Sequence, residues 1–193
     1  MSESFQSLSQ LGLPASAGER FALGGVRGST LPMLIAEAAS GYEGLLLVIT
    51  PDVQQAHQLE LETRFFLEDA GISVQTFPDR ETLPYDVFSP LPELVSQRLT
   101  ILHGLQQQKR GVLVVPVGTL MHRLCPPAFV HGHSLLISEG ETLDLGKMRA
   151  TLEQAGYRYV SQVIEHGEFT VRGSLLDLFP MGSELPYRID LFD

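Results

Sequence analysis

The sequence has little of what several classes of protein require. It contains one cysteine, Cys125, so an internal disulfide framework is excluded and a reducing compartment is permitted. Its longest apolar run, residues 44–49, is far shorter than the roughly 20 residues of a membrane-spanning helix. The first residues lack the basic-then-apolar pattern of a secretory signal. We therefore expect a cytoplasmic protein that has no membrane partner.

Basic residues are also few. The chain has 13 Lys and Arg against 23 Asp and Glu, which gives a formal net charge of −10. The excess of acid is evenly spread, because the parts before and after Cys125 are both net negative. Phosphate backbones would on average be repelled, so nucleic-acid binding by this segment alone is disfavoured. With 193 residues, of which 44% are hydrophobic, the chain can bury one substantial core or two small ones.

The first part of the chain alternates short apolar strands with helices. Strands are expected at residues 44–50, 73–77 and 111–116, and helices at 31–39, 53–68 and 94–107. Asp52 is a suitable N-cap for the second helix, and Gly71 is a suitable stop after it. The proline-rich stretch 78–92 is expected to be a loop. This alternation predicts an α/β fold with a parallel, doubly wound sheet and helices on both faces.

The pattern changes after Cys125. The Pro126-Pro127 pair ends the preceding helical turn and marks a domain boundary. A strand is then expected at 133–137, and a helix at 145–155 with Asp144 as its N-cap. Further strands follow, separated by glycine-containing turns. A smaller α+β domain fits this second part better than another parallel layer.

These boundaries predict three segments. Residues 1–22 form a leader, 23–125 the first α/β domain, and 126–193 the second, smaller domain. The alternating pattern of Tyr187, Ile189 and Leu191 continues to the last residues, so the second domain is expected to be truncated.

A glycine-containing segment, Gly25 to Thr30, precedes the first helix. In a P-loop nucleotidase this is the place of the phosphate-binding loop. A working loop ends in Gly-Lys followed by Ser or Thr, because the Lys reaches the phosphates and the hydroxyl holds Mg²⁺. Gly25, Gly28 and Ser29 can be matched to such a loop.

The match fails at the positions that perform the chemistry. It puts Thr30 at the second glycine, Leu31 at the lysine and Pro32 at the hydroxyl residue, and the first lysine of the chain is Lys109. The segment is thus either an ordinary turn or a degenerate phosphate loop made of Gly25, Gly28, Ser29 and Thr30. Both interpretations predict no ATP hydrolysis, although an anion could still rest on the helix N-terminus.

A metal site is not expected. His131 and His133, with His122 and Cys125 nearby, resemble one superficially, but a zinc site needs three or four converging ligands at finger-like spacing. We predict no metal and no cofactor, no catalytic residue, and an inert, partly buried thiol at Cys125.

Three stretches resemble a known family. They are residues 79–90 (DRETLPYDVFSP), residues 111–121 (GVLVVPVGTLM), and the motifs Gly156-Tyr157-Arg158, Glu165-His166-Gly167-Glu168-Phe169, Arg172-Gly173 and Asp177-Leu178-Phe179-Pro180. In this order they resemble the N-terminal region of the bacterial transcription-repair coupling factors (Mfd). The third set is also similar to the excision-repair helicase UvrB.

The resemblance implies a helicase-like, RecA/P-loop-like first domain with a decayed phosphate loop, followed by a UvrA-binding domain. The implied function is to recruit UvrA in transcription-coupled nucleotide excision repair without hydrolysing nucleotide. In that family, contacts to RNA polymerase and double-stranded DNA, and ATP-driven translocation, belong to regions outside this segment.

The resemblance also implies UvrA-binding positions, namely Arg158, Arg172, Phe169 and Phe179. Interface centres favour arginine and aromatic side chains, and arginine can pair bidentately with a carboxylate. Strand alternation alone would make the two phenylalanines core residues and would leave Arg172 solvated at a turn. Asp177 is a candidate partner for one of the arginines. The UvrB relatives carry one more arginine than this chain, so a smaller contact set is expected.

Two other functions stay open on the sequence. The chain could be an autonomous ATP-dependent nucleic-acid enzyme, as the helicase-like first domain suggests. Alternatively, it could be an intramolecular clamp that packs against a translocase and restrains it.

Overall fold

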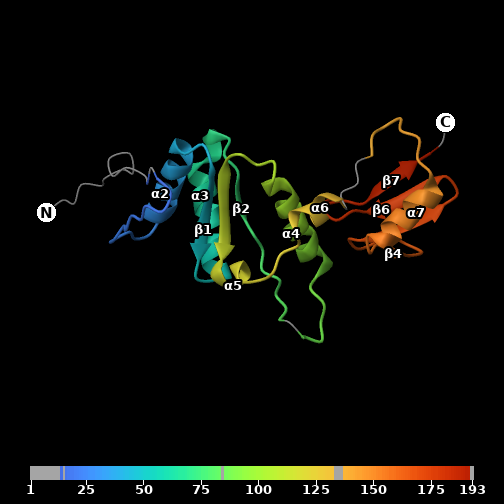
Figure 1. The fold of residues 1–193 in the computed structure, drawn as a ribbon, viewed down its shortest axis with the longest axis horizontal. Helices are drawn as coiled ribbons and strands as arrows, with labels where there is room; N and C mark the ends of the chain where they lie inside the picture. Colours follow the sequence, from blue (N-terminus) through green and yellow to red (C-terminus); the bar gives the residue numbers. More distant parts are fainter. Residues whose placement is uncertain (1–13, 15, 84, 133–136, 192–193) are drawn as a thin grey trace. The chain divides into compact units, whose positions relative to one another are not determined.

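The fold was analysed in a computed structural model that describes residues 14, 16–83, 85–132 and 137–191. These residues form two compact units (Figure 1). Unit 1 contains the described residues within 1–79 and 107–122, and unit 2 contains those within 80–106 and 123–193. The domain limits expected from sequence, 23–125 and 126–193, stay a prediction.

Unit 1 is built on a three-stranded parallel sheet. Its strands lie in the order β1 (Leu45–Thr50), β3 (Gly111–Pro116) and β2 (Val74–Thr76). The helical elements are α2 (Thr30–Gly41), α3 (Val53–Phe66), the 3₁₀ turn η1 (Glu68–Ala70) and α5 (Val117–Leu120). The strands and helices predicted here are confirmed. Every residue of β3 is buried, as expected for an apolar strand in the middle of a parallel sheet.

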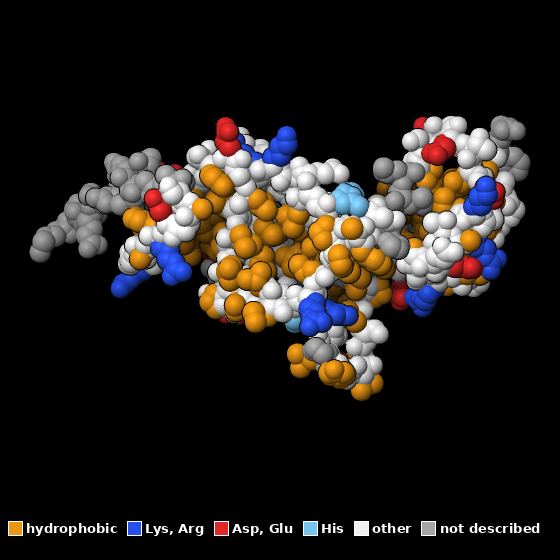
Figure 2. All heavy atoms as spheres, viewed as in Figure 1, with side chains coloured by type: hydrophobic (Ala, Val, Ile, Leu, Met, Phe, Trp, Pro, Cys, Tyr) orange, Lys and Arg blue, Asp and Glu red, His pale blue; other side chains and the backbone are white. Residues whose placement is uncertain are grey.

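The core of unit 1 lies on one face of its sheet. Ala39 of α2 and Ala56 of α3 are buried in one cluster with Val114 of β3, and the small side chains allow the helices to approach closely. On the opposite face of β1, Leu47 and Ile49 are each 52% exposed. Helices therefore cover only one face of β1, although the sequence predicted helices on both faces of the sheet. In the view of Figure 2, apolar side chains gather over the strands of this unit.

Local hydrogen bonds explain where the helices of unit 1 begin and end. The Asp52 carboxylate accepts from the backbone N–H of Gln55 at 2.7 Å, so it caps α3 as predicted. Gly71 follows η1 in the left-handed conformation, with φ of 63°. At the end of α2, the Arg110 guanidinium donates to the carbonyls of Ala39 at 3.0 Å and Ser40 at 2.6 Å.

Unit 2 combines helices with a four-stranded mixed sheet. The helices are α4 (Pro92–Leu105), α6 (Pro127–Gly132) and α7 (Leu145–Gln154). The strands follow in the order β4 (Arg158–Tyr159), β5 (Glu168–Arg172), β6 (Leu175–Phe179) and β7 (Tyr187–Asp190). Strand β4 runs parallel to β5, and the other pairs are antiparallel.

Capping and tertiary hydrogen bonds fix the helices of unit 2. Asp144 accepts from the N–H groups of Gly146 and Lys147, which confirms it as the N-cap of α7. Ser96 of α4 accepts through its hydroxyl from the backbone N–H of Gly182 at 2.7 Å, and this bond ties α4 to the turn after β6. The strand predicted at 133–137 lies outside the described residues, except for its last residue.

Strand alternation gives the second sheet two different faces. The inner face presents Phe169, Leu176 and Leu178, which form one core with Met148 and Leu152 of α7. The other face, which we call the outer face, presents Glu168, Thr170, Arg172, Asp177 and Arg188. The chain is thus α/β, with a parallel sheet in unit 1 and a mixed sheet in unit 2, and the predicted class is confirmed at this level.

The prediction for Cys125 was wrong. Its thiol is exposed, because the residue lies in the irregular connection between α5 and α6 and not in an element that faces a core. Within the described ranges, no His, Cys, Asp and Glu side chains gather in a group of three or more that could hold a metal. No helix among the described residues has the length and apolar character to cross a membrane.

Candidate functional site

The outer face of the second sheet brings together both arginines that the sequence singled out. The β4–β5 register places Arg158 opposite Glu168, and the β5–β6 register places Arg172 opposite Leu175 at the hairpin end. A two-residue turn closes this hairpin, and its first residue, Gly173, has a left-handed φ of 62°. The Arg158 and Arg172 side chains are 62% and 60% exposed. Arg172-Gly173 can therefore form the end of the hairpin and at the same time be part of an interaction site.

Arg158 is held between two carboxylates. Its Nη2 lies 2.9 Å from Oε2 of Glu165 and 3.0 Å from Oε1 of Glu168. Glu168 is itself buried and accepts from the backbone N–H groups of Ile164 and Glu165, both at 2.8 Å. The bond from the Glu165 N–H is the main cause of a lowered pKa at Glu168, with further lowering by Ile164 and Arg158 against the opposing effect of burial. The carboxylate thus orients Arg158 and fixes the preceding loop.

That loop, residues 160–167, joins two parallel strands with an unusually short connection. His166 stacks on Phe179 with ring centroids 4.0 Å apart, and its Nε2–H donates to the Ser183 carbonyl at 2.8 Å. Gly167 adopts a left-handed φ of 77°, which L side chains rarely tolerate. The Glu165–Phe169 motif, which carries part of the family resemblance, therefore also has a structural role. Its residues hold the loop that lies beside the outer face.

Asp177 connects two arginines across the sheet. Arg188 makes a bidentate pair with it, at 2.6 Å from Nε to Oδ1 and 2.9 Å from Nη2 to Oδ2. Arg172 Nη2 lies 3.7 Å from the same Oδ2 and donates to the Ser161 carbonyl at 3.3 Å. The Arg188 hydrogen bonds chiefly, and the charges of both arginines in addition, hold the pKa of Asp177 below its ordinary value.

The pairing of Asp177 with a predicted arginine is confirmed, but sequence reasoning missed its tighter partner, Arg188. A pairing of the two strands around Asp177 would have indicated Arg188. Arg188 is the direct cross-strand neighbour of Asp177 in the β6–β7 register, and opposite charges at such positions attract. That register depends on where β7 begins, which the sequence left uncertain.

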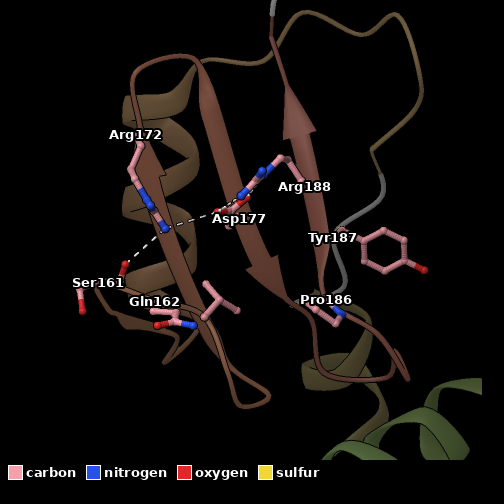
Figure 3. A pocket seen from close by; sticks show the side chains of 8 residues that line it. Ser161, Gln162, Arg172, Asp177, Pro186, Tyr187 and Arg188 are labelled. Atoms are coloured by element: carbon pink, nitrogen blue, oxygen red, sulfur yellow. Dashed lines mark hydrogen bonds and ion pairs between the residues drawn. The ribbon is translucent and has the colours of Figure 1, made fainter.

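These residues surround an open cleft of about 550 Å³ on the outer face, lined in part by Ser161, Gln162, Arg172, Asp177 and Arg188. Figure 3 shows Arg172 and Arg188 directed toward Asp177 from its two sides, while the Tyr187 ring points away. The Arg188 side chain is 63% exposed and that of Asp177 only 16%, so guanidinium groups form the rim and the carboxylate forms the floor.

The two phenylalanines lie on different faces. Phe169 is fully buried on the inner face and packs edge-to-face on Tyr159, with centroids 5.4 Å apart. Phe179 lies on the outer face, partly buried under His166. The structure therefore brings Arg158, Arg172 and Phe179 to one face, whereas Phe169 has the core position that strand alternation indicated.

The glycine-containing segment lies directly before α2. Gly25 and Gly28 have left-handed φ values of 75° and 57°, and Ser29 is the N-cap residue but makes no side-chain cap hydrogen bond. Thr30 is the first residue of α2. Among the described residues that precede this segment there is no strand, so the strand–loop–helix context of a phosphate loop is missing.

Comparison with known proteins identifies the family. Residues 135–193 match the family model described as the UvrB interaction domain. Over 94% of its length the chain is 49% identical to the transcription-repair-coupling factor of Escherichia coli (strain K12) and 46% identical to that of Haemophilus influenzae. The corresponding protein of Staphylococcus aureus (strain USA300) is 31% identical over 88% of this chain. The chain spans 16% of the first two relatives' length and 14% of the third's. The resemblance is thereby confirmed: this chain belongs with the transcription-repair-coupling factors, and its residues 135–193 match the UvrB interaction domain.

Proposed function

We propose that this chain is a protein-interaction module that recruits UvrA in transcription-coupled nucleotide excision repair. The observation that supports this most strongly is the exposed pair Arg158 and Arg172 on the outer face of a sheet that lies within the UvrB interaction match. The relatives are named for coupling transcription to repair. The chain spans 16% of their length. In this proposal, the contacts to RNA polymerase and double-stranded DNA and the ATP-driven translocation belong to parts of the whole protein outside this chain. The protein acts in the cytoplasm.

The outer face has the chemistry of a binding surface for a protein. Arginine guanidinium groups are weakly hydrated, so covering them costs less than covering lysine, and their planar fork suits carboxylates. The ion pairs to Glu165, Glu168 and Asp177 restrict the arginine side chains before any partner arrives. Exposed apolar side chains lie close by, with Ile164 at 68% exposed on the loop that precedes β5. Arginine beside apolar surface is typical of interface centres.

Unit 1, in this proposal, is a helicase-like domain that does not turn over ATP. Its parallel α/β sheet is compatible with that ancestry. Leu31, which is 45% exposed, and the buried Pro32 occupy the positions of a phosphate-binding lysine and a metal-binding hydroxyl. Isothermal titration of the chain with ATP and Mg²⁺ tests this point. ATP turnover by the purified chain would contradict it.

The partner assignment is tested by capture of UvrA on the immobilised chain. We expect the double variant Arg158→Ala, Arg172→Glu to lose most UvrA, because both exposed guanidinium groups are removed and one charge is reversed. Lys147→Glu is the matched control: it also reverses a charge, but on α7, which packs on the inner face. Circular dichroism checks that all variants fold. Unchanged capture by the double variant would remove these two residues from the site, and no capture by the unmodified chain would refute the function.

A further inference from the structure

The loop before α4 carries large apolar side chains that are open to solvent. Five of them are more than half exposed, namely Leu83, Tyr85, Val87, Phe88 and Leu91. We call these five residues the apolar knob. Figure 1 shows the loop extending beyond the N-terminal end of α4, and Figure 2 shows apolar side chains at its tip. Contiguous apolar patches on a protein surface mark sites of interaction.

The backbone of the apolar knob is fixed by its own hydrogen bonds. The Asp86 carboxylate accepts from the Leu83 N–H at 2.6 Å, and the Asp86 N–H donates to the Leu83 carbonyl at 3.1 Å. Between them Tyr85 has a left-handed φ of 75°, which residues other than glycine rarely adopt. The Tyr85 side chain is 104% exposed, so the core gains nothing from this strained turn. A strained turn that presents an aromatic side chain to solvent indicates a function.

We propose that the apolar knob docks into an apolar groove with basic residues at its rim, on a part of the whole protein outside these 193 residues. The charges beside the knob select this chemistry. Residues 80–93 contain one basic residue, Arg80, and three acidic residues, Glu81, Asp86 and Glu93. The carboxylates would meet Lys or Arg side chains at the rim, while the apolar side chains fill the centre of the groove. The inference is independent of the UvrA proposal.

The same charges disfavour a nucleic acid or a membrane as the ligand. Tyr85 and Phe88 have the flat rings that stack on unpaired bases, but the net charge of −2 over residues 80–93 repels a phosphate backbone. Anionic lipid surfaces attract basic segments, and this segment is acidic. A groove on a protein, with an apolar centre, fits both the side chains and the charges of the knob.

A groove within the same polypeptide fits better than one on a separate partner. The chain spans 16% of the length of its relatives from Escherichia coli and Haemophilus influenzae, so most of the surface of the whole protein lies outside it. A knob that stayed uncovered until a separate partner arrived would expose a patch prone to aggregation. Within one polypeptide the groove is present at a high effective concentration, so the knob is covered at all times.

The first test places a photo-crosslinker in the apolar knob of the whole protein. We expect p-benzoyl-phenylalanine in place of Phe88 to crosslink, within one molecule, to a segment outside residues 1–193, which mass spectrometry identifies. The matched control has the same replacement at Phe65, which is 71% exposed against 81% for Phe88 but lies on α3 of unit 1. The control should not give the crosslink found from Phe88.

The second test needs no substitution. Chymotrypsin cleaves after exposed aromatic residues such as Tyr85 and Phe88. We expect it to cut the knob about ten-fold faster in the 193-residue chain than in the whole protein, because only the whole protein contains the groove. Equal cleavage rates in the two proteins would overturn the inference.

The remaining outcomes distinguish the other ligands. A crosslink that joins two copies of the protein, or one that forms only when UvrA is added, would overturn the inference because the occupant would then be a separate molecule. A crosslinked segment without Lys or Arg beside it would refute the basic rim. Slower cleavage of the 193-residue chain after addition of single-stranded DNA or anionic vesicles would also overturn the inference, because the knob would then bind a nucleic acid or a membrane.

Discussion

The two sheets of this chain differ in which side chains their strands bury and which they present on the surface. In unit 1 the middle strand β3 is buried along its whole length, and no charged side chain lies in β1, β2 or β3. In unit 2 the strands alternate, with apolar side chains toward α7 and charged side chains on the outer face. The difference shows how burial limits function. β3, which is buried on both faces, contributes to the fold alone, whereas the sheet of unit 2 presents exposed arginines on a face where Glu168 and Thr170 are buried.

The same contrast explains why the sheet of unit 2 carries ion pairs, whereas the Arg64–Glu60 pair of unit 1 lies within helix α3. On the outer face Arg158 lies opposite Glu168 and Arg188 lies opposite Asp177, while Arg172 also lies near Asp177, so each guanidinium group has a carboxylate within 4 Å. Because the arginine side chains are 60% or more exposed, these pairs add little to stability, typically less than about 1 kcal/mol each. Their main effect is to arrange the arginines on the surface.

The largest effect is expected for Phe169→Ala. Phe169 is fully buried beneath the outer face, so its loss should lower the free energy of unfolding by about 3–5 kcal/mol through a cavity in the core. Chemical denaturation followed by circular dichroism measures this. If UvrA binding falls while the stability is unchanged, Phe169 is a contact residue and the division of the sheet into a core face and a binding face is incorrect.

A smaller effect, about 2 kcal/mol, is expected for Glu168→Gln, because the amide cannot satisfy two backbone N–H groups and Arg158 together. The pKa of Glu168 is lowered in the folded chain. Its stabilising effect is thus complete above the unfolded-state pKa of about 4.3 and is lost as the pH falls through the lower, folded-state pKa.

Unfolding curves recorded between neutral and acidic pH check this sign. The stability difference between the unmodified chain and Glu168→Gln should shrink as the pH falls below about 4.3. A difference that does not change over this range would show that the ionised carboxylate is not what fixes the loop. Glu165→Gln, at an exposed partner of Arg158, is the matched control and should change little.

The smallest effect is expected in unit 1, for Asp52→Ala. This change removes the N-cap bond to Gln55 and should lower the stability by about 1 kcal/mol. UvrA binding should be unchanged, because the proposed surface lies wholly in unit 2. Asp52→Asn, which retains a capping oxygen, should recover most of the loss. Weaker UvrA capture by a folded Asp52→Ala variant would mean that unit 1 also contributes to the interface.

Much of the fold could be predicted because its signals are local. The apolar runs of β1 and β3, the cap at Asp52 and the cap at Asp144 each depend on a few neighbouring residues, and all were confirmed. The exposure of Cys125 was predicted wrongly, since it depends on which segments pack over the residue. The site was predicted in part. Arg158 and Arg172 were found through family motifs, whereas Arg188 was missed because it joins the site only through strand pairing.

The sequence by itself determined which segments form helices and strands, the absence of a lysine and a hydroxyl at the phosphate-loop positions, and the family to which the chain belongs. These depend on composition, local spacing and motif identity. Only the tertiary structure decided that Arg158, Arg172 and Arg188 share one face, that Phe169 lies on the other, and that Glu168 is a buried anchor. The physical reason is the strand register, since a shift by one residue would move every side chain of a strand to the opposite face.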